Sequence, residues 1–102
     1  MTVPQDEFAP VTPGEMLKEE FLSEYGLSQN QLARVVGISA NRIADIVNNR
    51  RRITADTAVR LGLFFGNSPE FWMNLQAHYD LKMARKGLKP EDVERIKAQR
   101  VA

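Results

Sequence analysis

Two short helical patterns separated by a glycine constrain the fold of this 102-residue chain more than any other feature. In the first, Ser28 precedes Gln31 by three residues, the spacing of a capping box that begins a helix. Gly37 then interrupts the pattern, since glycine takes the positive φ of a tight turn without a steric penalty. Ser39 caps a second helical pattern directly afterwards. The sequence therefore predicts a helix, a tight turn and a second helix across residues 28–47.

Apolar residues recur at three- and four-residue intervals in both patterns, which predicts one inward face for each helix. Ala33 is small where the second helix has to approach closely. Helices joined in this way are typical of a helix-turn-helix, whose second helix enters the major groove of DNA. An ordinary helical hairpin is the alternative, because it has the same spacing. The expected inward residues are Leu32, Val35, Val36, Ile38, Ile43, Ile46 and Val47.

Charge is distributed unevenly along the chain, although the total is only +1. Residues 28–65 carry six arginines and two aspartates, a net charge of +4. Residues 1–27 carry six acidic residues and one lysine, a net charge of −5. A basic surface attracts the phosphate backbone of DNA, and an acidic surface is repelled by it. The distribution favours a DNA-binding helix-turn-helix over a hairpin of purely structural role.

Capping signals along the rest of the chain predict further helices and no strand. We expect an all-α protein with a compact five-helix domain over residues 12–86. A flexible acidic arm over residues 1–11 precedes this domain, and a C-terminal helical extension over residues 87–102 follows it. The extension is weakly amphipathic and is expected to need a partner for stability. The further helices are expected to begin after Thr12, Thr54, Ser68 and Lys89, with Gly26 and Gly66 ending two of them.

Two residues around the expected helix that begins after Thr54 call for separate predictions. Ile53 is expected to insert into the core as an apolar anchor. Gly62 lies inside a helical pattern, where glycine costs about 1 kcal/mol relative to alanine. We therefore expect either close packing of a neighbouring helix at Gly62 or a local kink.

Aromatic residues gather on the helix expected after Ser68. One helix-turn-helix contacts few base pairs, so a two-fold dimer with recognition helices about 34 Å apart would bind DNA far better. Trp72 and Tyr79 are the candidates for such a dimer interface. Burial in the core of the monomer is the alternative, above all for Phe71 and Leu75.

Composition excludes several other classes of protein. The chain has no cysteine, hence no disulfide and no thiolate metal site. No apolar run reaches the roughly 20 residues needed to cross a bilayer, and the first residues lack the features of a signal peptide, so we expect a cytoplasmic protein. His78, the only histidine, lies near Asp80 and Glu70 but has no metal-ligand spacing or nucleophile beside it. We expect no enzymatic activity, no metal and no cofactor.

Four sequence blocks together resemble the HigA-type antitoxins, which belong to the Xre, or lambda-repressor-like, group of helix-turn-helix proteins. The blocks are PGEMLKEEF (13–21), residues 27–51, ITADTAVRLGLFFG (53–66) and SPEFWMNLQAHYDL (68–81). Gly62 departs from the alanine usual in such proteins.

The resemblance implies a homodimer that binds a palindromic operator, represses its own operon and neutralises a HigB-type ribonuclease toxin. It assigns residues 29–36 to a positioning helix and residues 39–47 to a recognition helix. A stand-alone repressor of the same group, without a toxin, would share every residue that contacts DNA and is the alternative function.

The start of the recognition helix is expected to contact base edges. Arg42 can donate two hydrogen bonds to guanine O6 and N7, which discriminates between bases by about 1–3 kcal/mol, and Asn41 suits adenine. A phosphate contact alone is the alternative for Arg42. Asp45 either accepts from cytosine N4 or pairs with Arg42 or Arg50. The candidate base contacts are Ser39, Ala40, Asn41, Arg42 and Asp45.

Two further sets of residues are expected to contact partners. The start of the positioning helix attracts phosphate through its free amides, and the arginines contribute charge independent of sequence. The acidic segment complements a basic ribonuclease, although acidic helix faces are more often only solvated. The candidate phosphate contacts are Gln29, Asn30, Arg34, Arg50, Arg51 and Arg52, and the candidate toxin contacts are Phe8, Glu15, Glu19 and Glu20.

Overall fold

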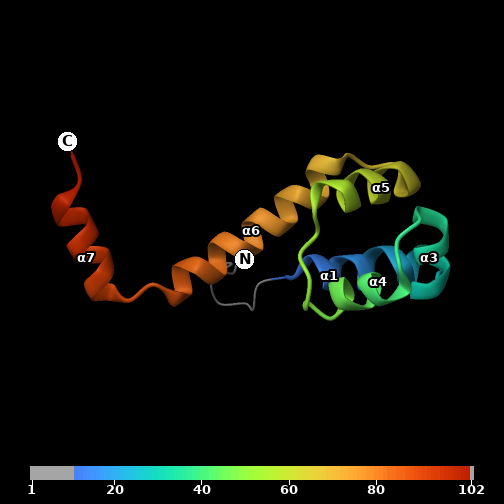
Figure 1. Cartoon of the computed structure of the whole chain (residues 1–102), viewed down its shortest axis with the longest axis horizontal. Coiled ribbons are helices and arrows are strands. Elements are labelled where there is room, and N and C mark those ends of the chain that lie inside the picture. The colour runs from blue at the N-terminus through green and yellow to red at the C-terminus, as the bar shows by residue number, and fades with distance from the viewer. Residues whose placement is uncertain (1–10, 102) are drawn as a thin grey trace, which may run out of the picture.

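The computed structural model describes residues 11–101, and all regular structure within them is helical (Figure 1). The first three elements follow one another without a break and form one helical segment. The expected five helices and one appended helix are therefore confirmed. The elements are α1 (Pro13–Met16), η2 (Leu17–Leu22), α2 (Ser23–Tyr25), α3 (Gln29–Val36), α4 (Ala40–Val47), α5 (Ala55–Phe65), α6 (Pro69–Gly87) and α7 (Pro90–Gln99).

Helices begin at the caps that the sequence predicts. The capping box is complete, since the Gln31 amide donates to Ser28 Oγ at 3.1 Å and the Ser28 amide donates to Gln31 Oε1 at 2.8 Å. The side-chain oxygens of Thr12, Thr54 and Ser68 each accept a hydrogen bond from the amide three residues later. These bonds satisfy amide donors that have no partner inside a helix.

The first helical segment contains a π-helical stretch, η2, which the sequence did not predict. A π-helical stretch bonds residues five apart instead of four, so residues at that spacing come to lie above one another. Leu17 and Leu22 are both buried as a result. Phe21 lies between them in sequence, and its ring centroid is 4.8 Å from those of Phe65 and Trp72. Leu17, Phe21 and Leu22 of η2 all contribute to the core.

Trp72 lies at the centre of the core and is fully buried, with its indole Nε1 donating to Asn67 Oδ1 at 3.0 Å. The prediction that Trp72 lies at a dimer interface is therefore wrong, because the ring has no surface to offer a partner. The neighbouring Phe71 is 36% exposed. Val35 also differs from expectation, since it is 56% exposed on α3 while its neighbour Val36 is buried. The apolar periodicity correctly predicted helix α3 but wrongly placed Val35 on its buried face.

Close backbone packing explains one glycine directly. A Cβ built on Gly62 would lie 2.7 Å from the carbonyl oxygen of Asn67 and 3.3 Å from the nitrogen of Pro69. The expected close packing is present, but the neighbour is the turn between α5 and α6 and not the body of another helix. Ile53, the expected anchor, is buried as well.

The C-terminal half of α6 and all of α7 extend away from the other helices (Figure 1). The extents of 51 × 34 × 23 Å and the radius of gyration of 16.9 Å reflect this, since a compact chain of 100 residues has about 13 Å. Helix α7 contains no buried residue. Among the helices of residues 11–101, none is long and apolar enough to cross a membrane.

Candidate nucleic-acid interface

Helices α3 and α4 form the expected helix-turn-helix. Gly37 ends α3 with φ +72°, and the amides of Gly37 and Ile38 both donate to the Ala33 carbonyl at 3.0 Å. Ala33 is buried between the helices, as its size predicted. Ile38 is buried after the turn, and Ser39 Oγ accepts from the Arg42 amide at 3.1 Å to begin α4. The turn thereby fixes where α4 starts.

The first turn of α4 leaves its predicted base-contacting residues at the surface. Ser39, Ala40 and Asn41 are exposed, and Arg42 is half-buried. The Nε of Arg42 is enclosed and has no hydrogen-bond partner among residues 11–101. A buried donor without an acceptor is uncommon in a folded protein. Among the predicted base contacts, Arg42 is therefore the residue with a buried donor that lacks a partner within residues 11–101.

The structure brings predicted base and phosphate contacts together in one hollow. The hollow lies at the junction of α3 and α4 and has a volume of about 510 Å³. Asn30 and Arg34 line it from α3, and Ser39 and Ala40 line it from the start of α4. Gln29 is half-buried at the first position of α3. Candidate phosphate contacts on α3 and candidate base contacts on α4 thus line the same hollow.

Helix α4 ends in a pair of hydrogen bonds around a left-handed residue. Asn49 has φ +58°, its amide donates to the Ile46 carbonyl at 3.1 Å, and the Arg50 amide donates to the Asp45 carbonyl at 2.7 Å. This arrangement is a Schellman motif with asparagine in place of the usual glycine. The Asn49 side chain also donates to the hydroxyl of Tyr79 at 2.8 Å. Tyr79 is half-buried and holds this turn, whereas the sequence proposed it for a dimer interface.

The three consecutive arginines have different surroundings. Arg50 pairs with Asp45 at 3.5 Å, which realises one of the two alternatives considered for Asp45. Arg52 pairs with Asp80 of α6. Arg51 is exposed and has no ion pair with the residues that the structure describes. Two of the three positive charges are therefore partly neutralised within the chain.

A buried glutamine extends the contact between α6 and these arginines. Gln76 is 4% exposed, and its Oε1 accepts from the Ile53 amide at 2.8 Å. Its Nε2 donates to Asp80 Oδ1 at 3.0 Å, so Asp80 receives bonds from both Gln76 and Arg52. Sequence reasoning missed this network, because its members are 23 and 28 residues apart and carry no common motif.

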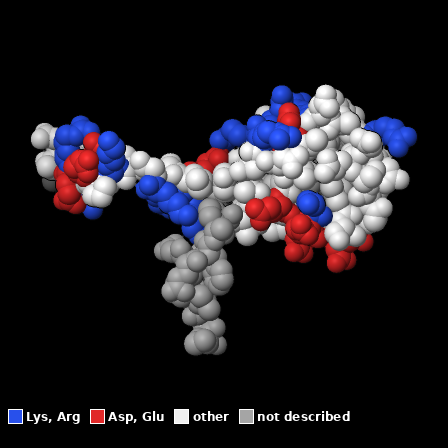
Figure 2. Space-filling view, turned by 90° about the horizontal axis from the view of Figure 1, so that it is seen from below, with Lys and Arg blue, Asp and Glu red and all other residues white. Residues whose placement is uncertain are grey.

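Acidic residues occupy a different part of the surface. Figure 2 shows Asp and Glu side chains gathered along one edge of the globular part and a group of Lys and Arg side chains on the opposite edge. Glu15, Glu19 and Glu20 are all exposed on the first helical segment. Phe8, the remaining candidate for toxin contact, lies outside the described residues. The charge separation expected from the sequence is thus present in space.

Comparison with known proteins places the chain in a family. A profile of the helix-turn-helix family matches residues 17–72, more than half of the sequence. Virulence-associated protein I of Dichelobacter nodosus is 46% identical over 86 residues, which cover 82% of this chain and 80% of that protein. Antitoxin HigA-1 of Vibrio cholerae is 42% identical over 72 residues, 71% of this chain and 68% of that protein. The chain belongs to the Xre-type helix-turn-helix family that includes the HigA antitoxins.

A solved structure extends the likeness to this Xre-type family over nearly the whole chain. The antitoxin HigA of Pseudomonas aeruginosa, solved with the higBA promoter, has a TM-score of 0.78 and 41% sequence identity. The match covers 91% of this chain and 97% of that one. Members of the family are transcriptional regulators and antitoxins, not enzymes. His78 accordingly has no catalytic role to explain, and it lies exposed on α6.

Proposed function

We propose that this chain is a HigA-type antitoxin that dimerises, binds a palindromic operator in its own promoter through α4, and neutralises a HigB-type ribonuclease toxin. The observation that carries the proposal is the exposed start of α4 beside the hollow lined by Asn30 and Arg34. A phosphate group at that hollow would hold α4 against the major groove. The related antitoxin HigA of P. aeruginosa was solved with the higBA promoter, which supports DNA binding by this chain.

Base contacts in this proposal come from Asn41 and Arg42, with Ser39 and Ala40 beside them. Arg42 is assigned to a base edge because it lies in the first turn of α4 and its guanidinium group matches the acceptors of guanine. Asp45 is assigned mainly to its ion pair with Arg50, because that pair satisfies its carboxylate without DNA.

Phosphate contacts are assigned first to Arg34 and Arg51, which have no ion pair within residues 11–101. Gln29 and Asn30 contribute at the start of α3, where helical amides favour an anion. Arg50 and Arg52 contribute less, since Asp45 and Asp80 already share their charge.

The dimer interface is assigned to the part of α6 that extends from the domain. Ala77, Leu81 and Ala84 are exposed there at intervals of four and three residues, and Leu88 continues the series. Such spacing gives one apolar stripe, and the two alanines permit close approach of a second helix. Leu81 is 53% exposed and Leu88 46%, so the stripe is uncovered in the single chain. A second copy of the same chain would cover it.

The toxin surface is assigned to the acidic edge, with Glu15, Glu19 and Glu20. Phe8, which lies outside the described residues, remains a further candidate from the sequence. A hollow of about 450 Å³ lies at Glu19, bounded by the end of the first helical segment and the start of α3. A basic ribonuclease is attracted to this edge by charge of the opposite sign. Because the acidic edge lies away from the basic group in Figure 2, a toxin there leaves much of the basic surface uncovered.

Two measurements test the proposal. The first is the affinity of the chain for its own promoter and for a scrambled duplex at one salt concentration, where we expect a preference of about 10³ or more. The second is growth of cells that express a short basic ribonuclease from the adjacent reading frame, with and without this chain. Rescue of growth is expected, and the triple variant E15K/E19K/E20K should lose it. Promoter binding without rescue would instead support a stand-alone repressor.

A further inference from the structure

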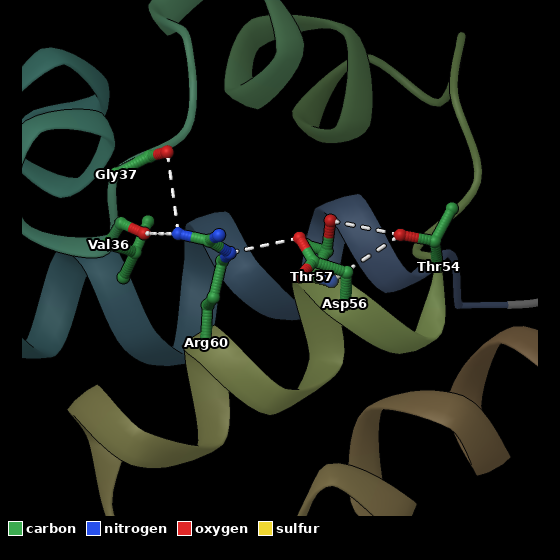
Figure 3. A network of polar contacts seen from close by, with 6 residues as sticks. All are labelled: Val36, Gly37, Thr54, Asp56, Thr57 and Arg60. Atoms are coloured by element: carbon green, nitrogen blue, oxygen red, sulfur yellow. Dashed lines mark hydrogen bonds and ion pairs between the residues drawn. The ribbon is translucent and has the colours of Figure 1, made fainter.

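Arg60 of α5 connects that helix to the turn of the helix-turn-helix (Figure 3). Its Nη1 donates to the carbonyl of Val36 at 2.8 Å and lies 3.5 Å from the carbonyl oxygen of Gly37. Its Nε donates to Asp56 Oδ2 at 2.9 Å. The side chain is thus held by an acid on its own helix while it contacts the end of α3. These two carbonyls belong to the last turn of α3, where helical carbonyls lack partners.

The chemistry at this junction favours an arginine. A positive charge near the C-terminus of a helix is stabilised by the helix dipole, and hydrogen bonds from a charged donor are stronger than neutral ones. The planar guanidinium group can address Asp56 and the Val36 carbonyl at once, from different nitrogens. A lysine ammonium keeps the charge and loses this fixed geometry.

The Arg60 side chain lies directly against the turn, since a Cβ built on Gly37 would be 3.0 Å from Arg60 Nη1. The φ of +72° at Gly37 is the feature that favours glycine there. On the other side, α5 is anchored by its cap, since Thr54 Oγ1 accepts from the Thr57 amide at 3.4 Å and lies 3.2 Å from the buried Thr57 Oγ1. Arg60 therefore joins an anchored helix to the short link between α3 and α4.

We propose that Arg60 is a positioning residue for operator recognition. It fixes the turn that sets the direction of α4 relative to α3, and it acts through protein carbonyls instead of through DNA. This inference rests on the proposed function, because operator preference is its main readout. Of the six arginines in residues 28–65, Arg60 is thus given a role within the protein and not a phosphate contact.

The test compares Arg60→Lys with Arg95→Lys as the matched control, since both keep the net charge and both arginines pair with an acid on their own helix. Arg95 lies on α7, outside the proposed DNA-binding surface. The affinities for the promoter duplex and for a scrambled duplex of equal length are measured below the unfolding temperature. R60K is expected to lose about tenfold in promoter affinity and to keep its affinity for scrambled DNA within about twofold. R95K is expected to keep both affinities. In the free protein, the amide NMR signals of Gly37 and Ile38 should shift in R60K and not in R95K.

Asp56→Ala gives a second variant that retains the fold, because the Asp56 side chain is 64% exposed. It removes the acceptor that holds Arg60 Nε, and the promoter preference is expected to fall about two- to threefold. An unchanged preference in R60K, or an equal loss on both duplexes, overturns the inference. Should R60K not fold, an unchanged preference in D56A overturns it. A wild-type chain without promoter preference removes the proposed function, and the Gly37 and Ile38 signals then decide whether Arg60 holds the turn.

Discussion

The guanidinium group of Arg52 pairs with the carboxylate of Asp80, which links the segment after the recognition helix to the middle of α6. The hydrogen bonds from Asn49 to Tyr79 and from Ile53 to Gln76 lie on the same two elements. The exit from α4 is thus fixed by one face of α6. In the proposed dimer, this connection would couple the spacing of the two recognition helices to the packing of α6.

The ion pairs predict different salt dependences for neighbouring arginines. Arg51→Ala should reduce the slope of log affinity against log salt concentration by about 1, because it removes one phosphate contact. Arg52→Ala should reduce the slope by clearly less, since Asp80 already shares that charge. Fluorescence anisotropy with promoter DNA over a series of salt concentrations gives both slopes. Equal slopes for R51A and the wild-type chain would contradict the assignment.

Replacement of Gln76 by an apolar residue of similar size should destabilise the fold, because the hydrogen bond from the Ile53 amide is lost. Gln76→Leu leaves the buried Ile53 amide without an acceptor, which should lower the free energy of unfolding by about 1–3 kcal/mol. Asn74→Leu is the control, because Asn74 is exposed on the same helix. Urea denaturation followed by circular dichroism measures both. If Q76L were as stable as N74L, the hydrogen bond to Ile53 would have no measurable role.

Truncation of Trp72 should cause a larger loss of stability than the loss of the Gln76 hydrogen bond. Trp72→Ala removes a fully buried ring from contact with Phe21 and Phe65, which should cost about 3–5 kcal/mol. Phe71→Ala should cost less, because Phe71 is 36% exposed. Thermal unfolding compares the two, with the lower midpoint expected for W72A. A W72A chain that keeps its midpoint and becomes monomeric would restore Trp72 to an interface.

A single charge introduced into the apolar stripe on α6 should weaken the proposed dimer. Leu81→Asp should convert the dimer to a monomer, since it places a carboxylate within the proposed helix pair. Leu63→Asp is the control, because Leu63 is 81% exposed on α5, away from the stripe. Sedimentation equilibrium measures the mass of each variant. The interface would have to lie elsewhere if L81D remained dimeric or if L63D alone dissociated.

Local signals in the sequence predicted most of the helical architecture. Ser28, Ser39 and Thr54 cap helices because a side-chain oxygen three residues ahead of an amide needs no distant partner. The exposed start of α4 followed from the same local spacing. These features depend on neighbours in the chain, so one sequence suffices to identify them.

Contacts between distant segments were the part that the sequence could not predict. The pairing of Arg52 with Asp80 spans 28 residues, and that of Arg60 with Val36 spans 24. The arginines were visible in the sequence, but the packing of α5 and α6 determines that Arg52 and Arg60 contact these distant partners. The burial of Trp72 was missed for a related reason, because an aromatic stripe on a helix fits a core and an interface equally well.

Recognition of DNA bases by α4 is tested most directly at Arg42, through the base pair that it is proposed to contact. The affinities of the wild-type chain and Arg42→Ala are measured for the promoter duplex and for duplexes with each half-site base pair changed in turn. We expect that one base-pair change, which costs the wild-type chain about 1–3 kcal/mol in binding free energy, costs R42A almost nothing. If R42A kept the full base preference of the wild-type chain and lost affinity equally for every duplex, α4 would not read the operator through Arg42.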